Sequence, residues 1–217
     1  MSQPDYRGLR IGVLAIQGAF ARHLEVCARL GADAVEVRTA DQLEDLDGLI
    51  IPGGESTTMV KVIAAEHWLR DLETFGKSKP VMGTCAGMVL MGSEVDDPRV
   101  QPFGWMPIRV FRNAYGSQVN SFRDVGEVTG FPGHPDMEMV FIRAPKFESL
   151  SGDVKILGTC RAEPVLARYG HHLALSFHPE LTDDDRVHRY WLDTVMRQST
   201  NFNALDTTPI ESGHGAP

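Results

Sequence analysis

A cysteine between small residues is the strongest chemical signal in this sequence. The stretch Gly83–Gly87 reads Gly-Thr-Cys-Ala-Gly and lies between an apolar run and a helical pattern, as in a nucleophile elbow. Glycine is needed on both sides because the turn that exposes the nucleophile passes close to neighbouring backbone. At a helix N-terminus, the positive end of the helix dipole favours a thiolate over a thiol. We therefore predict that Cys85 is a nucleophile and that the Ala86 N–H is one oxyanion donor.

A thiol nucleophile needs a base that a third group holds in place. The stretch Ser176–Glu180 follows an apolar strand and offers both a histidine and a carboxylate. Side chains two positions apart on an extended backbone project to the same side, so we expect Glu180 to orient the His178 ring. The alternative is a plain surface turn. The other seven histidines, which lie in helical patterns, turns or loops, are interpreted as structural or solvated: His23, His67, His134, His171, His172, His188 and His214.

A third piece of the site is a glycine pair after another apolar strand, in Pro52-Gly53-Gly54-Glu55-Ser56. Two glycines let the backbone turn its N–H groups outward as a nest for an anion. We predict that the Gly54 N–H is the second oxyanion donor. The stretch is not a P-loop, because no Gly-Lys-Ser/Thr follows it. Taken alone, the stretch is typical of an ordinary turn. We interpret it as part of a site only because the other two motifs are present.

The three cysteines are widely spaced and provide no disulfide framework and no paired metal ligands. Each has a simple alternative role as a small buried residue. We retain that interpretation for Cys27, on the apolar face of a helical pattern, and for Cys160, at a strand end. We expect no metal, no organic cofactor, and a reducing, cytoplasmic compartment.

The elements that must position these residues indicate an α/β fold with a parallel sheet. Strands expected at 11–16, 34–37, 47–51 and 80–84 alternate with helices: one after Gly18, one from Ser56 or Thr57 to about Phe75, and one from Ala86. Later strands are expected at 108–112, 139–143, 154–159, 164–169 and 172–177, and a last helix ends at Arg197. We predict one domain, 1–198, and a flexible tail, 199–217.

Composition narrows the class of protein. The formal net charge of -8 argues against a nucleic-acid or anionic membrane partner, both of which attract basic surfaces. Hydrophobic residues make up 42% of the chain, enough for a sizeable core. No apolar run approaches the ~20 residues of a membrane span, and the first ten residues lack a signal-peptide core. We expect a globular enzyme with no nucleic-acid and no membrane partner.

The motifs together resemble the class I glutamine amidotransferases, and within them the PdxT/SNO family of glutaminase subunits of pyridoxal 5'-phosphate synthase. The resemblance runs from about Ile11 to Arg197, and its most specific stretches are Glu55–Met59 and Arg112–Gly116. It implies a flavodoxin-like three-layer α/β fold with a mainly parallel central sheet and an added antiparallel region. The matching stretches are Ala15–Gly18, Pro52–Met59, Gly83–Gly87, Arg112–Gly116, Phe141–Pro145 and Ser176–Thr182.

The resemblance also implies a reaction. Cys85, His178 and Glu180 would hydrolyse L-glutamine to glutamate and ammonia through a glutamyl thioester. The implied substrate-binding residues are Gly54, Glu55, Ser56, Arg112, Ile142 and Arg143. Free glutamine carries an α-carboxylate and an α-ammonium, which suit the forked donors of Arg112 and the carboxylate of Glu55. For Arg143, the backbone is expected to matter more than the guanidinium.

Finally, the resemblance implies a partner: a (β/α)8-barrel pyridoxal 5'-phosphate synthase subunit of the PdxS/SNZ type, in a large heteromeric complex. The synthase would combine the ammonia with ribose 5-phosphate and glyceraldehyde 3-phosphate. The isolated chain is then expected to have little activity, and Gln17 is the predicted link between partner and oxyanion hole. Alternatives are a glutaminase for another synthetase such as imidazole glycerol phosphate synthase, a free-standing cysteine hydrolase or peptidase, and a non-catalytic regulatory module on the same fold.

Overall fold

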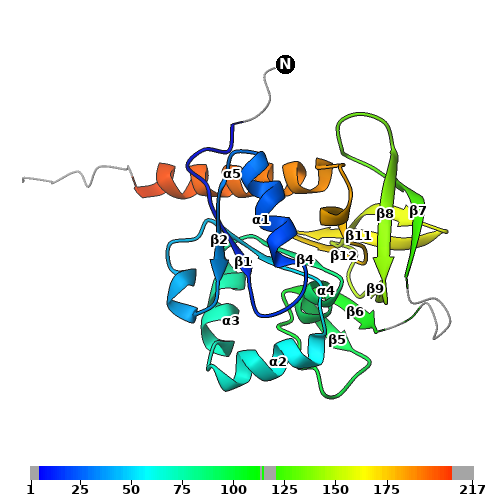
Figure 1. Ribbon diagram of the computed structural model, residues 1–217, viewed down its shortest axis with the longest axis horizontal. Coiled ribbons are helices and arrows are strands. Elements are labelled where there is room, and N and C mark those ends of the chain that lie inside the picture. The colour runs from blue at the N-terminus through cyan, green and yellow to red at the C-terminus, as the bar shows by residue number, and fades with distance from the viewer. Residues whose placement is uncertain (1–4, 113, 115–120, 207–217) are drawn as a thin grey trace, which may run out of the picture.

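The computed structural model describes residues 5–112, 114 and 121–206, and the side chains up to residue 199. It has three layers, a central sheet with helices on both faces (Figure 1). Asn113, Tyr115 and Gly116 of the motif noted above lie outside the described residues, as does the part of the predicted tail after Asp206.

Nine strands of the described chain form the main sheet, in the order β2-β1-β3-β4-β12-β11-β10-β7-β8. The first five in that order run parallel: β2 (Asp33–Val37), β1 (Arg10–Leu14), β3 (Gly48–Ile51), β4 (Val81–Thr84) and β12 (His172–Leu175). Their arrangement is the 2-1-3-4-5 order of flavodoxin-like folds. The remaining four pair antiparallel: β11 (Glu163–Tyr169), β10 (Lys155–Cys160), β7 (Ser121–Val128) and β8 (Asp136–Ile142). The predicted architecture, a parallel sheet with an antiparallel addition, is confirmed.

A smaller sheet of β5 (Gly92–Val95), β6 (Met106–Phe111) and β9 (Lys146–Ser149) lies beside the main one. The sequence pattern predicted β6 but not β5, β7 or β9. β7 reads Ser-Phe-Arg-Asp-Val-Gly-Glu-Val, which is mostly polar and contains a glycine, so its strand propensity is weak. It is a strand because β8 and β10 pair with it on both sides.

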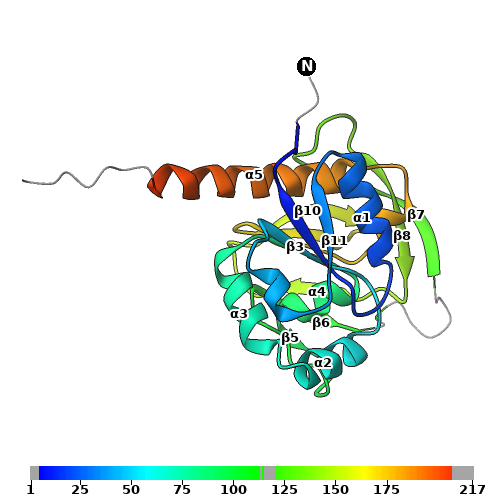
Figure 2. The ribbon, with the colours of Figure 1, turned by 60° about the vertical axis from the view of Figure 1, so that its left-hand side comes forward.

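Helices cover both faces of the main sheet (Figure 2). On one face lie α1 (Phe20–Arg29) and α5 (Arg186–Asp206), and on the other lie α2 (Ser56–Ala65), α3 (Leu69–Ser78) and α4 (Ala86–Met91). Two short 3-10 helices, η1 (Ala40–Leu43) and η2 (Pro179–Leu181), complete the described elements. None of the described helices is long and apolar enough to cross a membrane.

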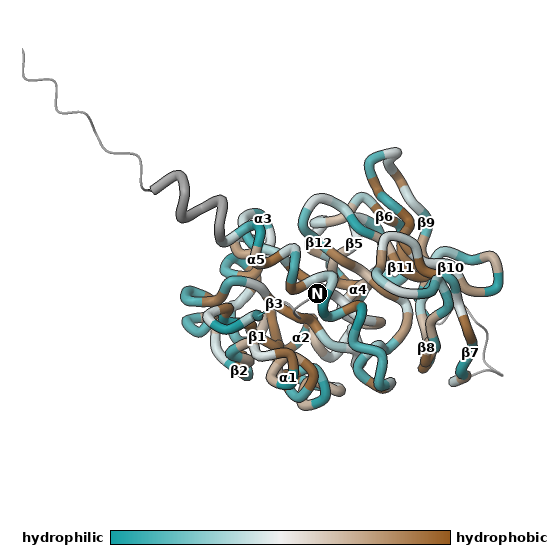
Figure 3. The backbone as a smooth tube through the Cα atoms, turned by 90° about the horizontal axis from the view of Figure 1, so that it is seen from above, coloured by the Kyte–Doolittle hydropathy of each residue, from teal (hydrophilic) through white to brown (hydrophobic). Residues whose placement is uncertain are grey.

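The core is divided by the sheet because successive strand side chains face opposite sides. In β3, Leu49 and Ile51 join the cluster under α2, α3 and α4, whereas Ile50 joins the cluster under α1 and α5. Hydrophobic stretches gather in the strands at the middle of the molecule, and hydrophilic stretches lie outside them (Figure 3). Both clusters hold the parallel strands fixed, and so fix the loops at their ends.

The single helix predicted from Ser56 to Phe75 is wrong, because the structure has two helices there, α2 and α3. His67 has a left-handed φ of 61°, and its N–H donates to Ala64 O at 3.3 Å. The Trp68 N–H donates to Ile63 O at 3.0 Å, which completes a Schellman motif. Glycine usually occupies this left-handed position, so the sequence, with a histidine there, did not indicate that the helix ends.

The last helix extends beyond its predicted end. α5 runs to Asp206, so residues 199–206 of the predicted tail are helical. No glycine or proline occurs between Arg197 and Asp206 to interrupt the helix. The Ser199 hydroxyl also donates to Asp47 Oδ1 at 3.0 Å, which ties this part of the helix to the loop before β3.

Candidate active site

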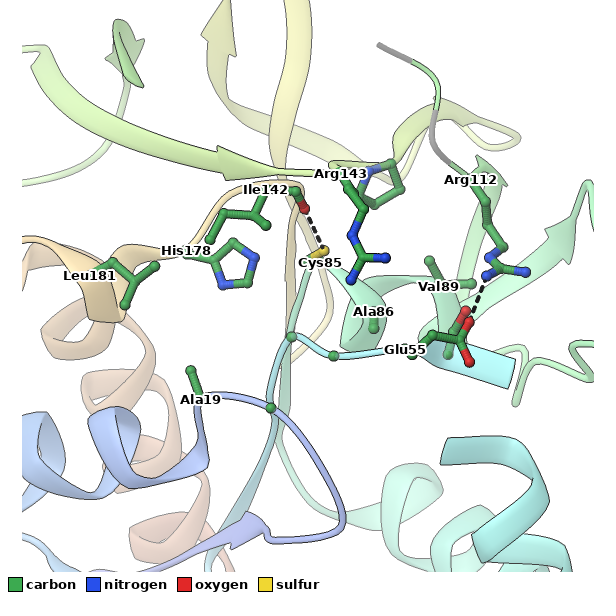
Figure 4. Close-up of a pocket in the computed structure, with 15 residues that line it drawn as sticks. Ala19, Glu55, Cys85, Ala86, Val89, Arg112, Ile142, Arg143, His178 and Leu181 are labelled. Carbon is green, nitrogen blue, oxygen red and sulfur yellow. Dashed lines mark hydrogen bonds and ion pairs between the residues drawn. The ribbon is translucent and has the colours of Figure 1, made fainter. Parts of the chain in front are cut away.

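The predicted site residues converge at one edge of the sheet, where β1, β3, β4 and β12 end (Figure 4). A cavity of about 240 Å³ lies there, smaller than the roughly 300–1,000 Å³ of pockets for drug-sized ligands. Its size suits a ligand no larger than an amino acid. Nine predicted residues line it: Gly54, Glu55, Ser56, Cys85, Ala86, Arg112, Ile142, Arg143 and His178. The other two, Glu180 and Gln17, lie directly behind that lining.

Cys85 occupies a strained turn between β4 and α4. Its φ of 50° and ψ of -104° are rare for a non-glycine residue, and its N–H donates to Leu175 O at 2.8 Å. A Cβ atom at Gly83 would lie 2.6 Å from the Gly87 carbonyl carbon. A Cβ at Gly87 would lie 2.0 Å from Ile51 O. The prediction that close backbone approach requires small residues around the cysteine is confirmed.

The Cys85 thiol contacts the end of β8. Its Sγ lies 3.6 Å from the Ile142 carbonyl oxygen, which accepts the S–H. The next residue, Arg143, has a left-handed φ of 44°. For a non-glycine residue this conformation stores strain, and such residues cluster at functional sites. The predicted importance of the backbone at this pair is therefore consistent with the position of the Ile142 carbonyl.

His178 is held against both the backbone and a carboxylate. The backbone N–H of His178 donates to Val140 O at 2.8 Å, and the ring Nδ1 lies 2.8 Å from Glu180 Oε1. The ring packs on Gly53, where a Cβ atom would lie 2.2 Å from His178 Cε1. One edge of the ring faces Cys85 (Figure 4), and the buried Nε2 has no hydrogen bond to a described residue. The structure thus brings the three predicted catalytic residues together.

The charges of this group reinforce one another. Burial lowers the pKa of His178, but the nearby Cys85 sulfur and the Glu180 carboxylate outweigh it and raise the pKa to about 10. Burial raises the pKa of Glu180, but His23 and the hydrogen bond from His178 outweigh this effect and lower the pKa to about 2. These surroundings therefore favour the imidazolium form of His178 and the carboxylate form of Glu180. A protonated imidazole beside a thiol favours the nucleophilic thiolate.

The glycine pair after β3 touches the loop after β1. A Cβ atom at Gly18 would lie 1.6 Å from Gly53 O, so this carbonyl points at the Gly18 backbone. The peptide is trans, so the Gly54 N–H points the opposite way. The Gln17 carbonyl oxygen lies 3.5 Å from where a Gly54 Cβ would be, and Gln17 Oε1 is buried without a hydrogen-bond partner in the described structure. Gln17 thus lies beside the predicted oxyanion loop.

The charged residues expected to bind substrate are paired with each other. Arg112 Nη2 lies 2.9 Å from Glu55 Oε1, and Nη1 contacts Asp97. Glu55 is the N-cap of α2, with its carboxylate accepting from the Thr57 and Thr58 N–H groups. Burial raises the pKa of Glu55, but these threonine bonds lower it more, to about 2. Asp97 had no signal in the sequence, because it joins the site only through Arg112.

Arg143 differs from Arg112 in having no partner among the described residues. The described structure contains no hydrogen bond or ion pair from its guanidinium, which enters the pocket beside Cys85 and Ala86 (Figure 4). The expectation that its backbone matters more than the guanidinium stays a prediction. The remaining wall of the pocket, which sequence reasoning did not assign, is formed by Gly18, Ala19, Gly53, Val89, Pro145 and Leu181.

Two histidines interpreted as structural lie next to the catalytic group. His23 and His188 are fully buried, and His23 Nε2 lies 3.3 Å from Glu180 Oε2. Both were interpreted as structural or solvated; their burial excludes the solvated alternative, and their proximity to Glu180 was not predicted. They come from α1 and α5, which are far apart in sequence, and helical periodicity contains no information about such a contact.

Comparison with known proteins agrees with this geometry. A model of the SNO glutamine amidotransferase family matches residues 13–197. The pyridoxal 5'-phosphate synthase subunit PdxT of Solibacter usitatus is 44% identical over 86% of this chain and 99% of its own length. The PdxT of Koribacter versatilis is 46% identical over 86% of this chain and 96% of its own. A crystal structure of a glutamine amidotransferase, 42% identical, has a TM-score of 0.80 and covers 86% of this chain and 98% of that one.

Proposed function

Because the chain belongs to the SNO glutamine amidotransferase family, we propose that it hydrolyses L-glutamine and passes the ammonia to a synthase that makes pyridoxal 5'-phosphate. The observation that carries the proposal is the pairing of His178 with buried Glu180, 2.8 Å apart, on the side of the pocket that holds Cys85. The names of the similar PdxT proteins support the synthase as the consumer of ammonia.

Glutamine binds with its side-chain amide at Cys85 and its α-carbon groups toward α2. The cation for the α-carboxylate is Arg143 or Arg112, and the anion for the α-ammonium is Glu55. Within the described part of the chain the Arg143 guanidinium has no partner, whereas Arg112 already bridges Glu55 and Asp97. Arg143 is therefore the cation that can bind the α-carboxylate without breaking an existing ion pair, and Arg112 holds Glu55 in place.

In the first half-reaction, the Cys85 thiolate attacks the side-chain amide carbon of glutamine. The oxyanion of the tetrahedral intermediate accepts hydrogen bonds from the Ala86 N–H and the Gly54 N–H. His178, as imidazolium, gives a proton to the amide nitrogen, the C–N bond breaks, and ammonia leaves. A glutamyl thioester on Cys85 remains.

In the second half-reaction, neutral His178 removes a proton from water, which attacks the thioester carbon. The C–S bond breaks, the new γ-carboxyl group releases its proton to solvent as glutamate leaves, and His178 and Cys85 return to their starting charges. Glu180 accepts the Nδ1–H bond throughout, so that Nε2 faces the reacting atoms. Each step uses only groups of this chain, glutamine and water.

The partner is a (β/α)8-barrel synthase subunit that combines the ammonia with ribose 5-phosphate and glyceraldehyde 3-phosphate. The isolated chain has little activity, and docking at Gln17 completes the oxyanion hole. The hydrogen bond from the Cys85 thiol to Ile142 O supports this, because a carbonyl oxygen stabilises the thiol and not the thiolate. The three free cysteines are compatible with work in the reducing cytoplasm.

The test is a glutaminase assay of the purified chain with and without the barrel synthase, comparing the wild type with Cys85→Ala. We expect glutamate release only from the wild type and mainly in the presence of the synthase. Equal activity of Cys85→Ala would overturn the mechanism. A Cys85 that does not react with a glutamine-analogue alkylator in the complex would instead indicate a regulatory module, and co-purification with another synthetase would reassign the partner.

A further inference from the structure

A buried pair of histidines continues the catalytic group into the core. Glu180 Oε1 accepts from His178 Nδ1 at 2.8 Å, and its other oxygen, Oε2, lies 3.3 Å from His23 Nε2. His23 Nδ1 in turn lies 3.0 Å from His188 Nε2. The His23 and His188 residues are 0% exposed, and so is the Glu180 side chain. Helices α1 and α5 thus meet directly behind η2, which carries Glu180.

These contacts allow one arrangement of protons in the neutral pair. A carboxylate only accepts hydrogen bonds, so the proton of His23 lies on Nε2, facing Glu180. Nδ1 of the neutral His23 ring is then an acceptor, and His188 donates to it from Nε2. His188 Nδ1 remains an acceptor without a proton, and this atom is buried with no partner among the described residues. Both N–H groups therefore point toward Glu180.

The charged surroundings agree with neutral rings. The groups facing His23 are Glu180, His178 and His188, and Arg29 acts on His188 from the end of α1. Burial lowers the pKa of His23 and brings that of His188 to about 3. The Thr84 hydroxyl, at 3.4 Å from His23 Nε2, links the pair to the residue before Cys85.

We propose that His23, held by His188, is a positioning residue that fixes the Glu180 carboxylate in the orientation that serves His178. The inference rests on the proposed glutaminase function. Glu180 Oε2 makes no hydrogen bond to a described residue, and His23 Nε2, 3.3 Å away, is the polar atom that faces it. A buried carboxylate oxygen without a donor is costly. Without His23, Glu180 rotates or takes up a proton, and His178 loses its fixed orientation.

The test compares His23→Gln with His23→Leu in the complex with the synthase. The glutamine amide can donate at the position of Nε2, whereas leucine fills similar space without a donor. We expect His23→Leu to lower kcat on the order of 10- to 100-fold, as for other groups that orient a catalytic side chain, with KM nearly unchanged. The acid limb of its pH–kcat profile moves to higher pH, and His23→Gln keeps most of kcat and the wild-type profile.

A second readout needs neither glutamine nor partner. The rate of Cys85 alkylation by iodoacetamide is followed by mass spectrometry from pH 5 to pH 9, and its pH midpoint rises in His23→Leu but not in His23→Gln. The alkylation measurement still tests His23 if the wild-type complex releases no glutamate. Absence of glutamate release would overturn the proposed function but not the role of His23. His172→Leu removes another buried histidine, outside the site, and should leave the alkylation midpoint in place.

Wild-type kinetics and alkylation in both His23 variants would overturn the proposal. Equal losses in both variants, in proportion to their loss of thermal stability, would assign His23 a packing role and also overturn it. Should His23→Leu fail to fold, His188→Gln and His188→Leu put the same question one residue further from Glu180. Equal kcat values in the two His188 variants would count against the proposed positioning of Glu180.

Discussion

Cys85 is subject to two opposing influences. The Ile142 carbonyl oxygen accepts the thiol hydrogen, whereas the positively charged His178 ring favours a thiolate. A carbonyl oxygen repels a thiolate, so the sulfur reacts readily only where His178 outweighs Ile142. The electrostatic role of Glu180 in keeping His178 charged is therefore central to the proposed chemistry.

Glu180→Gln tests this role with almost no change in volume. The amide cannot stabilise an imidazolium as the carboxylate does, so the raised pKa of His178, about 10 in the wild type, falls. We expect kcat/KM for glutamine to drop by roughly 10²- to 10⁴-fold, the range of general acid–base contributions. The measurement is glutamate release by the complex across pH 6–10. An unchanged rate and profile would show that the carboxylate charge is not needed.

Arg143 combines a guanidinium that pairs with no described residue and a strained backbone, and two substitutions separate these properties. Both Arg143→Ala and Arg143→Gly remove the guanidinium, and we expect both to raise the KM for glutamine. Only glycine adopts the φ of 44° freely, so Arg143→Gly should be more stable than Arg143→Ala by about 1 kcal/mol. Steady-state kinetics and urea denaturation measure the two effects. A normal KM in both variants would transfer the carboxylate-binding role to Arg112.

At the scale of elements, the site depends on where strands and helices end. Four parallel strands stop at the same edge, and the loops after β1, β3, β4 and β12 bring Gly18, Gly53, Cys85 and His178 together. The end of α2 and the start of α3 also depend on packing. At this break, Trp68 lies in the same core cluster as Ile63 and Met59 of α2.

His67→Gly tests the origin of this break. A histidine at φ 61° bears the steric cost of the left-handed region, which glycine does not. Because the side chain is exposed, we expect His67→Gly to raise the free energy of unfolding by about 1 kcal/mol. His67→Ala is the matched control: it loses the imidazole but keeps the strain, so it should remain near the wild type in urea denaturation. Equal stability of the two variants would place the cause of the break elsewhere.

At the scale of the whole molecule, buried titratable groups make folding depend on pH. The pKa of Glu180, about 2 against an ordinary 4.5, contributes stability that is lost as pH falls below 4.5. The pKa of His188, about 3 against 6.5, contributes stability that is lost as pH falls below 6.5. The pKa of His178, about 10, works in the opposite direction, and its contribution is lost as pH rises from 6.5 to 10.

The expected result is a maximum of the unfolding free energy near neutral pH, with a decline on both sides. Urea denaturation from pH 4 to pH 10 measures it. In His188→Leu, the acid decline between pH 6.5 and pH 4 should be shallower, because one group that takes up a proton on unfolding is gone. A slope identical to that of the wild type would show that His188 is not a neutral buried ring in the folded protein.

Much of this arrangement was accessible from the sequence because it depends on local signals. The small residues around Cys85, the glycine pair at 53–54 and the His-Pro-Glu turn are short patterns with direct steric or electrostatic causes. Alternating apolar strands and helices predicted the parallel sheet for the same reason. The strands β5, β7 and β9 were missed because pairing with neighbours, rather than their own composition, makes them strands.

By itself, then, the sequence determined the type of fold, the family resemblance and the identity of the three residues proposed to do the chemistry. Only the tertiary structure decided which charges pair: Arg112 with Glu55 and Asp97, and Glu180 with both His178 and His23. The physical reason is that strain and short-range periodicity act between neighbours along the chain. Electrostatic pairing acts through space, between groups that only the packing of α1, α5 and the strand ends brings within a few ångströms.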